Sequence, residues 1–120
     1  MKKLKEKLQT YLKRYSGQED DEISWQEAME KRERENVLLV DVRSVQEYEE
    51  GHVDGAICVP HYELASKAEK VLNKKEQTII LYCQTGARSK KAYRILKKLG
   101  YTNLYYIKED LQIALRSYGK

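Results

Sequence analysis

The sequence predicts an α/β domain with a mostly parallel central sheet flanked by helices. Three observations favour this class. Short apolar runs typical of strands alternate with helical patterns over about 100 residues. The chain has 120 residues and no internal repeat, which suits one small domain. Its hydrophobic fraction of 41% can form a core and excludes a disordered acidic tail.

Four short apolar runs have the composition of strands. Residues 37–40 form a continuous run that ends at Asp41, and residues 56–59 form another that ends at the only proline. Residues 78–82 are the clearest strand because they are rich in β-branched side chains, and residues 103–107 form the last one. Continuous apolar runs are typical of strands buried on both faces, as in a parallel sheet.

Helical patterns separate these runs. Ser24 is placed to cap a helix that contains Trp25, Ala28 and Met29, and Glu27 at the third helical position completes a capping box. Residues 45–50 form a short helical turn that Gly51 ends. The remaining predicted helices, each with apolar residues along one side, cover residues 61–72, 88–99 and 108–118.

An additional amphipathic helix is predicted over residues 1–15. Its apolar side has leucines and tyrosines at helical spacing, and its other side carries Lys2, Lys3, Lys5, Lys7, Lys13 and Arg14. The acidic residues 19–22 follow as a linker, which divides the chain into an N-terminal segment (1–22) and a domain (23–120). We expect the helix to pack on the domain or on a second copy. Docking on a partner or a membrane surface is the alternative.

The composition excludes several classes of protein. The net charge of +4 (23 basic minus 19 acidic residues) is too small to indicate a nucleic-acid partner. No apolar run is long enough to span a membrane, and charges interrupt the N-terminal leucines where a signal peptide would be apolar. Two cysteines are too few for a disulfide framework, and His52 and His61 lack neighbours at metal-ligand spacing. We therefore expect a soluble, cytoplasmic protein with reduced thiols and no metal site.

Residues 82–89 carry the most informative chemistry. A strand ends at Tyr82, a loop of small and polar residues follows, and a helix begins. Ligand sites in open α/β sheets lie at the carboxyl ends of strands. Gly86 permits a turn in which successive backbone N–H groups bind negative charge, and the helix N-terminus adds to this effect. Cys83 lies at the rim of the loop, so its thiolate, the nucleophilic form, should be favoured.

The end of the loop adds a cation and a hydroxyl. Arg88 begins a strongly basic helix, and its planar guanidinium can bind an oxyanion with two parallel hydrogen bonds. Ser89 is expected to cap that helix, whereas Lys97 and Lys98 at its far end are expected to be solvated. Cys58, in an apolar run, is expected to be a buried small residue.

Several ordered segments resemble the rhodanese-like sulfurtransferase domain. They are LVDVR at 39–43, EY at 47–48, GHV at 51–53, GAI at 55–57, Pro60, CQTGARS at 83–89 and LGY at 99–101. LVDVR is similar to the first signature strand of the family, and CQTGARS is similar to its active-site loop. The resemblance covers residues 23–107, and it is specific because the segments occur together in this order.

The resemblance implies a persulfide enzyme that needs no cofactor. A donor such as thiosulfate gives its outer sulfur to Cys83, and an acceptor such as cyanide or a thiol then removes it. Arg88 would bind the anionic end of the donor. The other loop residues implied in substrate binding are Gln84, Thr85, Gly86, Ala87 and Ser89. Asp41 and Arg43 would support the fold as an ion pair bracing the loop.

Two other functions remain as alternatives. A non-catalytic or regulatory interaction module would use the same fold for docking, but it would have no physical need for both Cys83 and Arg88. A cysteine-dependent phosphatase would need a wider loop, because related phosphatases have one more residue between the cysteine and the arginine. Four residues separate Cys83 from Arg88 here, which favours sulfur transfer.

The sequence departs from the family pattern at two places. Relatives specialised for thiosulfate often have further basic residues inside the loop, whereas Gln84 and Ala87 are neutral. A protein persulfide or a polysulfide is therefore an alternative donor to thiosulfate. After the last strand, residues 107–111 replace a Gly-Gly pair that is common in the family. We expect this segment to pack differently and to change one wall of the pocket.

Overall fold

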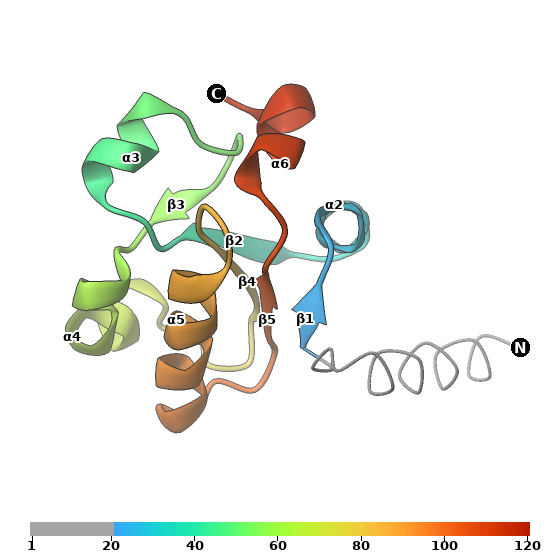
Figure 1. Cartoon of the computed structure of the whole chain (residues 1–120). Helices are drawn as coiled ribbons and strands as arrows, with labels where there is room; N and C mark the ends of the chain where they lie inside the picture. Colours follow the sequence, from blue (N-terminus) through green and yellow to red (C-terminus); the bar gives the residue numbers. More distant parts are fainter. Residues whose placement is uncertain (1–20) are drawn as a thin grey trace, which may run out of the picture.

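The computed structural model describes residues 21–120, so the predicted N-terminal helix lies outside the described part of the chain. A five-stranded parallel sheet in the order β1-β5-β4-β2-β3 forms its centre, which confirms the predicted fold class (Figure 1). The strands are β1 (Glu22–Ile23), β2 (Val37–Asp41), β3 (Ile57–Cys58), β4 (Thr78–Tyr82) and β5 (Leu104–Ile107). The helices are α2 (Trp25–Arg34), α3 (Val45–Glu50), α4 (His61–Val71), α5 (Ala87–Lys98) and α6 (Leu111–Tyr118).

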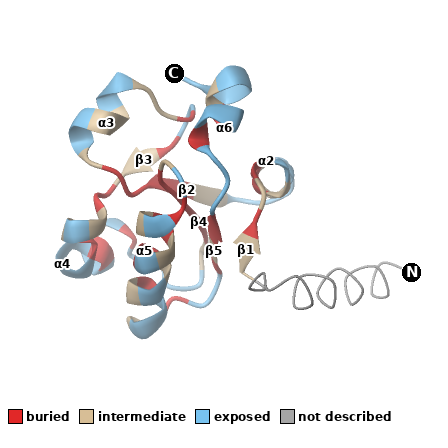
Figure 2. Cartoon of the chain, viewed as in Figure 1, coloured by how far each residue is buried: buried red, intermediate tan, exposed pale blue. Residues whose placement is uncertain are grey.

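The side chains of β4 alternate between two apolar clusters. Ile79 and Leu81 belong to the cluster that includes buried residues of α4 and α5, whereas Ile80 and Tyr82 belong to the cluster that includes those of α2 and α6. This alternation follows from the two-residue period of a strand. Cys83, the next residue, falls on the α4 and α5 side. Figure 2 shows that burial is concentrated in the sheet and on the sides of the helices that cover it.

α2 contains Trp25, Ala28 and Met29, as predicted, and ends at Arg34, after which the Glu35 N–H donates to the last-turn carbonyl of Lys31. Another predicted helix begins later in the structure than expected. The helix predicted over residues 108–118 begins only at Leu111, because the Asp110 carboxylate caps it by accepting from the Gln112 N–H at 2.9 Å. Residues 108–110 therefore remain a loop.

β1 was not predicted as a strand. It has two residues and begins at Glu22, the last residue of an acidic run, so it lacks the apolar pattern that marks the other strands. Its strand conformation depends on parallel pairing with β5, in which Ile23 lies opposite Ile107. None of the helices within residues 21–120 has the length and apolar character needed to cross a lipid bilayer.

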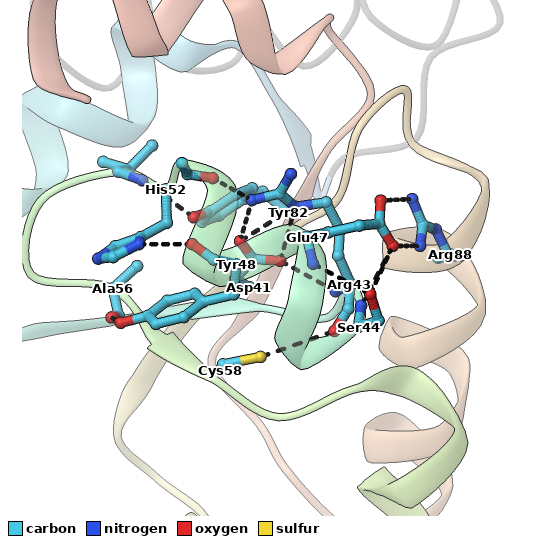
Figure 3. A network of polar contacts seen from close by, with 12 residues as sticks. Asp41, Arg43, Ser44, Glu47, Tyr48, His52, Ala56, Cys58, Tyr82 and Arg88 are labelled. Atoms are coloured by element: carbon cyan, nitrogen blue, oxygen red, sulfur yellow. Dashed lines mark hydrogen bonds and ion pairs between the residues drawn. The ribbon is translucent and has the colours of Figure 1, made fainter. Parts of the chain in front are cut away.

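A buried ion pair closes the carboxyl end of β2 (Figure 3). Asp41 is fully buried and Arg43 is 4% exposed. The Arg43 guanidinium donates to both carboxylate oxygens, through Nε to Oδ1 at 3.0 Å and through Nη2 to Oδ2 at 2.7 Å. Nη2 also donates to the carbonyl oxygen of Gly51 at 2.6 Å. Because Gly51 directly follows α3, this bond attaches the end of α3 to the end of β2.

A second buried contact attaches the segment after α3 to β4, the strand next to β2. The Tyr82 hydroxyl oxygen accepts from the Val53 N–H at 3.1 Å, and both residues are fully buried. Burial raises the pKa of Tyr82, and the nearby Asp41 charge raises it further, so the hydroxyl stays protonated at neutral pH. The Tyr82 ring also packs edge-on against Trp25, with ring centroids 5.1 Å apart.

Replacement of Tyr82 by phenylalanine should lower the free energy of unfolding by about 1–3 kcal/mol, because it leaves the buried Val53 N–H without an acceptor. Urea unfolding followed by circular dichroism measures this change. Tyr62→Phe is the matched control, since Tyr62 is 66% exposed and should change stability by less than about 0.5 kcal/mol. Equal stabilities of the two variants would contradict the assigned role of the Tyr82 hydroxyl.

Replacement of Arg43 by methionine should lower the free energy of unfolding by about 3–5 kcal/mol, because it leaves the Asp41 carboxylate buried without a cation. The double variant Asp41→Asn/Arg43→Met removes both charges but keeps a side-chain oxygen at position 41. It should recover a large part of the lost stability in the same urea titration. A double variant less stable than Arg43→Met would show that the buried charge is not the main cost.

Candidate active site

Cys83 lies directly after β4, at the carboxyl edge of the sheet. The residue is only 2% exposed and borders the apolar cluster under α4 and α5. Two backbone N–H groups nevertheless point at its sulfur: Gly86 N lies 3.0 Å and Ser89 N lies 3.4 Å from Sγ. The sulfur is therefore buried but faces two backbone donors, an arrangement that can bind an anionic sulfur.

Ser89 holds the loop from the first turn of α5. Its hydroxyl lies 3.0 Å from the carbonyl oxygens of both Gly86 and Ile107, to which it can donate. The Cys83 thiol in turn donates to the Ser89 oxygen at 3.6 Å. Ser89 was predicted to be a helix cap, but the capping position is occupied by Gly86. Ser89 instead connects the loop, Cys83 and the end of β5.

Gly86 occupies a position that other residues would not fit. Its φ of +103° lies in the left-handed region, and a Cβ atom there would lie 2.7 Å from the Cα of Lys108. The Lys108 backbone thus packs directly against the loop. A side chain at position 86 would both strain the turn and push the loop away from its neighbour.

The segment after β5 forms one wall of the loop. The Leu111 N–H donates to the Gln84 carbonyl oxygen at 2.9 Å, and the Gln84 side-chain amide donates to the Asp110 carboxylate at 3.2 Å. Thr85 and Ala87, also predicted to bind substrate, are exposed. The backbone N–H of Ala87 is one of those at a helix start that have no acceptor within the helix.

Arg88 reaches across to α3 rather than standing alone at the loop. Its Nη1 and Nη2 donate to the Oε1 and Oε2 atoms of Glu47 at 2.6 and 3.0 Å (Figure 3). The hydrogen bond from Arg88 is the main reason why the pKa of Glu47 is lowered to about 2, although partial burial opposes that shift. The pair therefore stays ionised across the physiological pH range.

Sequence reasoning did not assign Glu47 to the site. The local signal was present, because Ser44 and Glu47 have the spacing of a capping box. The Glu47 N–H donates to the Ser44 oxygen at 3.2 Å, and Glu47 Oε1 accepts from the Ser44 N–H at 3.2 Å. What the sequence pattern could not indicate is the contact with Arg88, which lies 41 residues further along the chain.

Cys58, the other cysteine, is directed at the backbone of Arg43 (Figure 3). It is half-buried rather than fully buried as predicted, and its thiol donates to the Arg43 carbonyl oxygen at 3.6 Å. Burial raises the pKa of Cys58 to about 11, and the charge of Asp41 contributes. Cys58 is therefore a neutral thiol at neutral pH. Among residues 21–120, no three metal-binding side chains cluster together.

Two curated relatives are similar to this chain, one over most of its length and the other over about half of it. A tRNA uridine(34) hydroxylase of Protochlamydia amoebophila is 32% identical over 110 residues, which cover 87% of this chain and 32% of the relative. The thiosulfate sulfurtransferase PspE of Escherichia coli is 35% identical over 65 residues, which cover 54% of this chain and 62% of the relative. The chain thus matches less than two thirds of the length of either protein.

A solved structure extends the comparison to the fold. The human single-domain sulfurtransferase TSTD1 superposes with a TM-score of 0.72 at 25% sequence identity. The superposition covers 81% of this chain and 96% of that one. The rhodanese-like domain family itself matches residues 24–112, which include the loop, Glu47 and the Asp41–Arg43 pair. Because the match spans most of the sequence, the chain belongs to the rhodanese-like domain family.

Proposed function

We propose that this protein is a sulfurtransferase that carries sulfane sulfur as a persulfide on Cys83. The observation that carries the proposal is the sulfur of Cys83 at the end of β4, with the N–H groups of Gly86 and Ser89 directed at it. Such donors stabilise negative charge on sulfur, both on the free thiolate and on a persulfide. The donor would be thiosulfate or another sulfane-sulfur compound, and the acceptor a thiol or cyanide.

The proposed reaction has two displacement steps. The Cys83 thiolate attacks the outer sulfur of the donor, the donor S–S bond breaks, and its inner part leaves with the bonding electron pair. With thiosulfate the leaving group is sulfite. The acceptor then attacks the outer sulfur of the persulfide, and Cys83 leaves as the thiolate with the electron pair of the broken bond. No net oxidation occurs at Cys83 over the cycle.

The named relatives support this proposal at the level of sulfur chemistry. PspE is named a thiosulfate sulfurtransferase and TSTD1 a single-domain sulfurtransferase, and TSTD1 matches this chain over 96% of its own length. The hydroxylase relative indicates that family members also occur in proteins of other activity. Only 32% of the length of that relative corresponds to this chain, so the hydroxylase activity of the whole relative does not indicate the activity of this chain.

Incubation with thiosulfate, or with glutathione persulfide, should increase the intact mass of the protein by about 32 Da, the mass of one sulfur atom. Cyanide or dithiothreitol should remove this mass. Cys83→Ser should abolish the gain, because it removes the sulfur that forms the new bond. Intact-mass spectrometry before and after the cyanide chase measures both steps.

Cys58→Ser is the matched control, because Cys58 is the other free cysteine of the chain and is a neutral thiol at neutral pH. It should keep the mass gain. A gain that persists in Cys83→Ser, or that disappears only in Cys58→Ser, would refute Cys83 as the carrier. Loading without any release to cyanide or a thiol would favour a non-catalytic role.

Gly86→Ala should slow sulfur loading at least about tenfold, because strain and the clash with Lys108 displace the N–H groups that face Cys83. Gly100→Ala tests the strain alone. Gly100 has a similar φ of +96°, but a Cβ there meets only the flexible Lys75 side chain at 3.8 Å. Gly100→Ala should lose about 1–2 kcal/mol of stability and load at the normal rate. Equal loading rates in both variants would contradict the role of the loop geometry.

A further inference from the structure

Both terminal nitrogens of Arg88 are already bound to a carboxylate. Nη1 and Nη2 pair with the two oxygens of Glu47 at 2.6 and 3.0 Å, which is the two-pronged geometry that a guanidinium would otherwise offer to an oxyanion. The two side chains are about one third exposed, 32% for Arg88 and 34% for Glu47. The pair therefore lies at the surface of the site, within reach of a ligand.

Glu47 is held in this position from its own side. Its Oε1 accepts from the Ser44 N–H at 3.2 Å and from the Ser44 hydroxyl at 3.1 Å. The helix that carries it, α3, is in turn attached to the buried Arg43 through the Gly51 carbonyl oxygen. An ordinary surface glutamate could rotate away at little cost, but this carboxylate would have to leave four hydrogen-bond donors, two on Ser44 and two on Arg88, in order to do so.

The pairing changes what the site can recognise. Arg88 is the only charged residue between Cys83 and Ser89, and Glu47 neutralises it. Thiosulfate carries two negative charges and presents three oxygens at the end that leaves, so it needs free donors and net positive charge. An organic persulfide presents a carbon-bound sulfur at that end and does not need a free guanidinium.

We propose that Glu47 determines donor specificity by occupying Arg88, so that the site disfavours thiosulfate and favours an organic persulfide. This inference rests on the proposed sulfur transfer. With an organic persulfide, Cys83 attacks the outer sulfur, the persulfide S–S bond breaks, and the carbon-bound sulfur leaves as a thiolate with the bonding electron pair. The outer sulfur becomes the terminal sulfur of the Cys83 persulfide, and no oxidant or reductant is consumed.

Glu47→Gln tests this inference with little disturbance of the fold. Glutamine also completes a capping box with serine, so α3 keeps its N-terminal cap while the ion pair is lost. Glu27→Gln is the matched control: Glu27 has the same position in the capping box of α2, where it bonds to Ser24. Circular dichroism of both variants checks that they are folded.

The first measurement is binding without turnover. Isothermal titration of thiosulfate into Cys83→Ser and into Cys83→Ser/Glu47→Gln compares the affinities with Arg88 paired and free. We expect the loss of Glu47 to tighten thiosulfate binding about tenfold, equivalent to about 1.4 kcal/mol. Cys83→Ser/Glu27→Gln should bind as Cys83→Ser does. Adding Arg88→Gln to the Glu47 variant should abolish the gain in affinity.

The second measurement is turnover with Cys83 intact. In Glu47→Gln, the ratio of kcat/KM for thiosulfate to kcat/KM for glutathione persulfide should rise about tenfold relative to the unmodified protein. In Glu27→Gln the ratio should stay the same. A shift confined to KM for thiosulfate would show that Glu47 acts on donor binding.

Equal thiosulfate affinities with and without Glu47 would overturn the inference, as would a gain that survives Arg88→Gln. These outcomes are separate from the failure of sulfur transfer itself. If glutathione persulfide loads Cys83 while the affinities are equal, only the role of Glu47 is wrong. If no donor adds sulfur to Cys83, the proposed function fails, and the inference about its donor fails with it.

Discussion

The buried ion pair between Asp41 and Arg43 is the constraint on which the site depends. A charge pair without exposure to water is tolerated only when its hydrogen bonds are satisfied, and here the guanidinium satisfies both carboxylate oxygens and the carbonyl oxygen of Gly51. The pair fixes the end of β2, the end of α3 and the turn between them as one unit. This unit holds α3, the helix that carries Glu47, against the end of β2.

The same unit reaches the surroundings of Cys83 through a second ion pair. α3 presents Glu47, Glu47 binds Arg88, and Arg88 lies in the first turn of α5, next to the N–H of Ser89 that faces Cys83. Two pairs of opposite charge, one buried and one at the surface, thus connect β2 to the loop after β4. The loop is held on its other side by the segment after β5, through contacts to Gly86 and Gln84. The loop that follows Cys83 is therefore held from two directions.

Sequence patterns predicted those parts of the molecule that are determined locally. The apolar runs predicted four of the five strands, and residues 83–89 indicated the loop because a strand, a glycine and a helix start follow one another there. Contacts between distant segments could not be predicted. Residues 22–23 form a strand only because they pair with β5, and the partner of Arg88 lies 41 residues away in the sequence. The near-complete burial of Cys83 likewise arises from helices that pack over the sheet.

The lengths of the strands at the two borders of the sheet have a consequence for association between molecules. β1 and β3, which form these borders, have only two residues each. A long border strand offers a row of unpaired backbone groups on which a foreign strand can add, and natural proteins avoid that hazard with very short border strands. The longer strands β2, β4 and β5 are all interior. The arrangement leaves little backbone available for intermolecular sheet extension, which protects the apolar strands from aggregation.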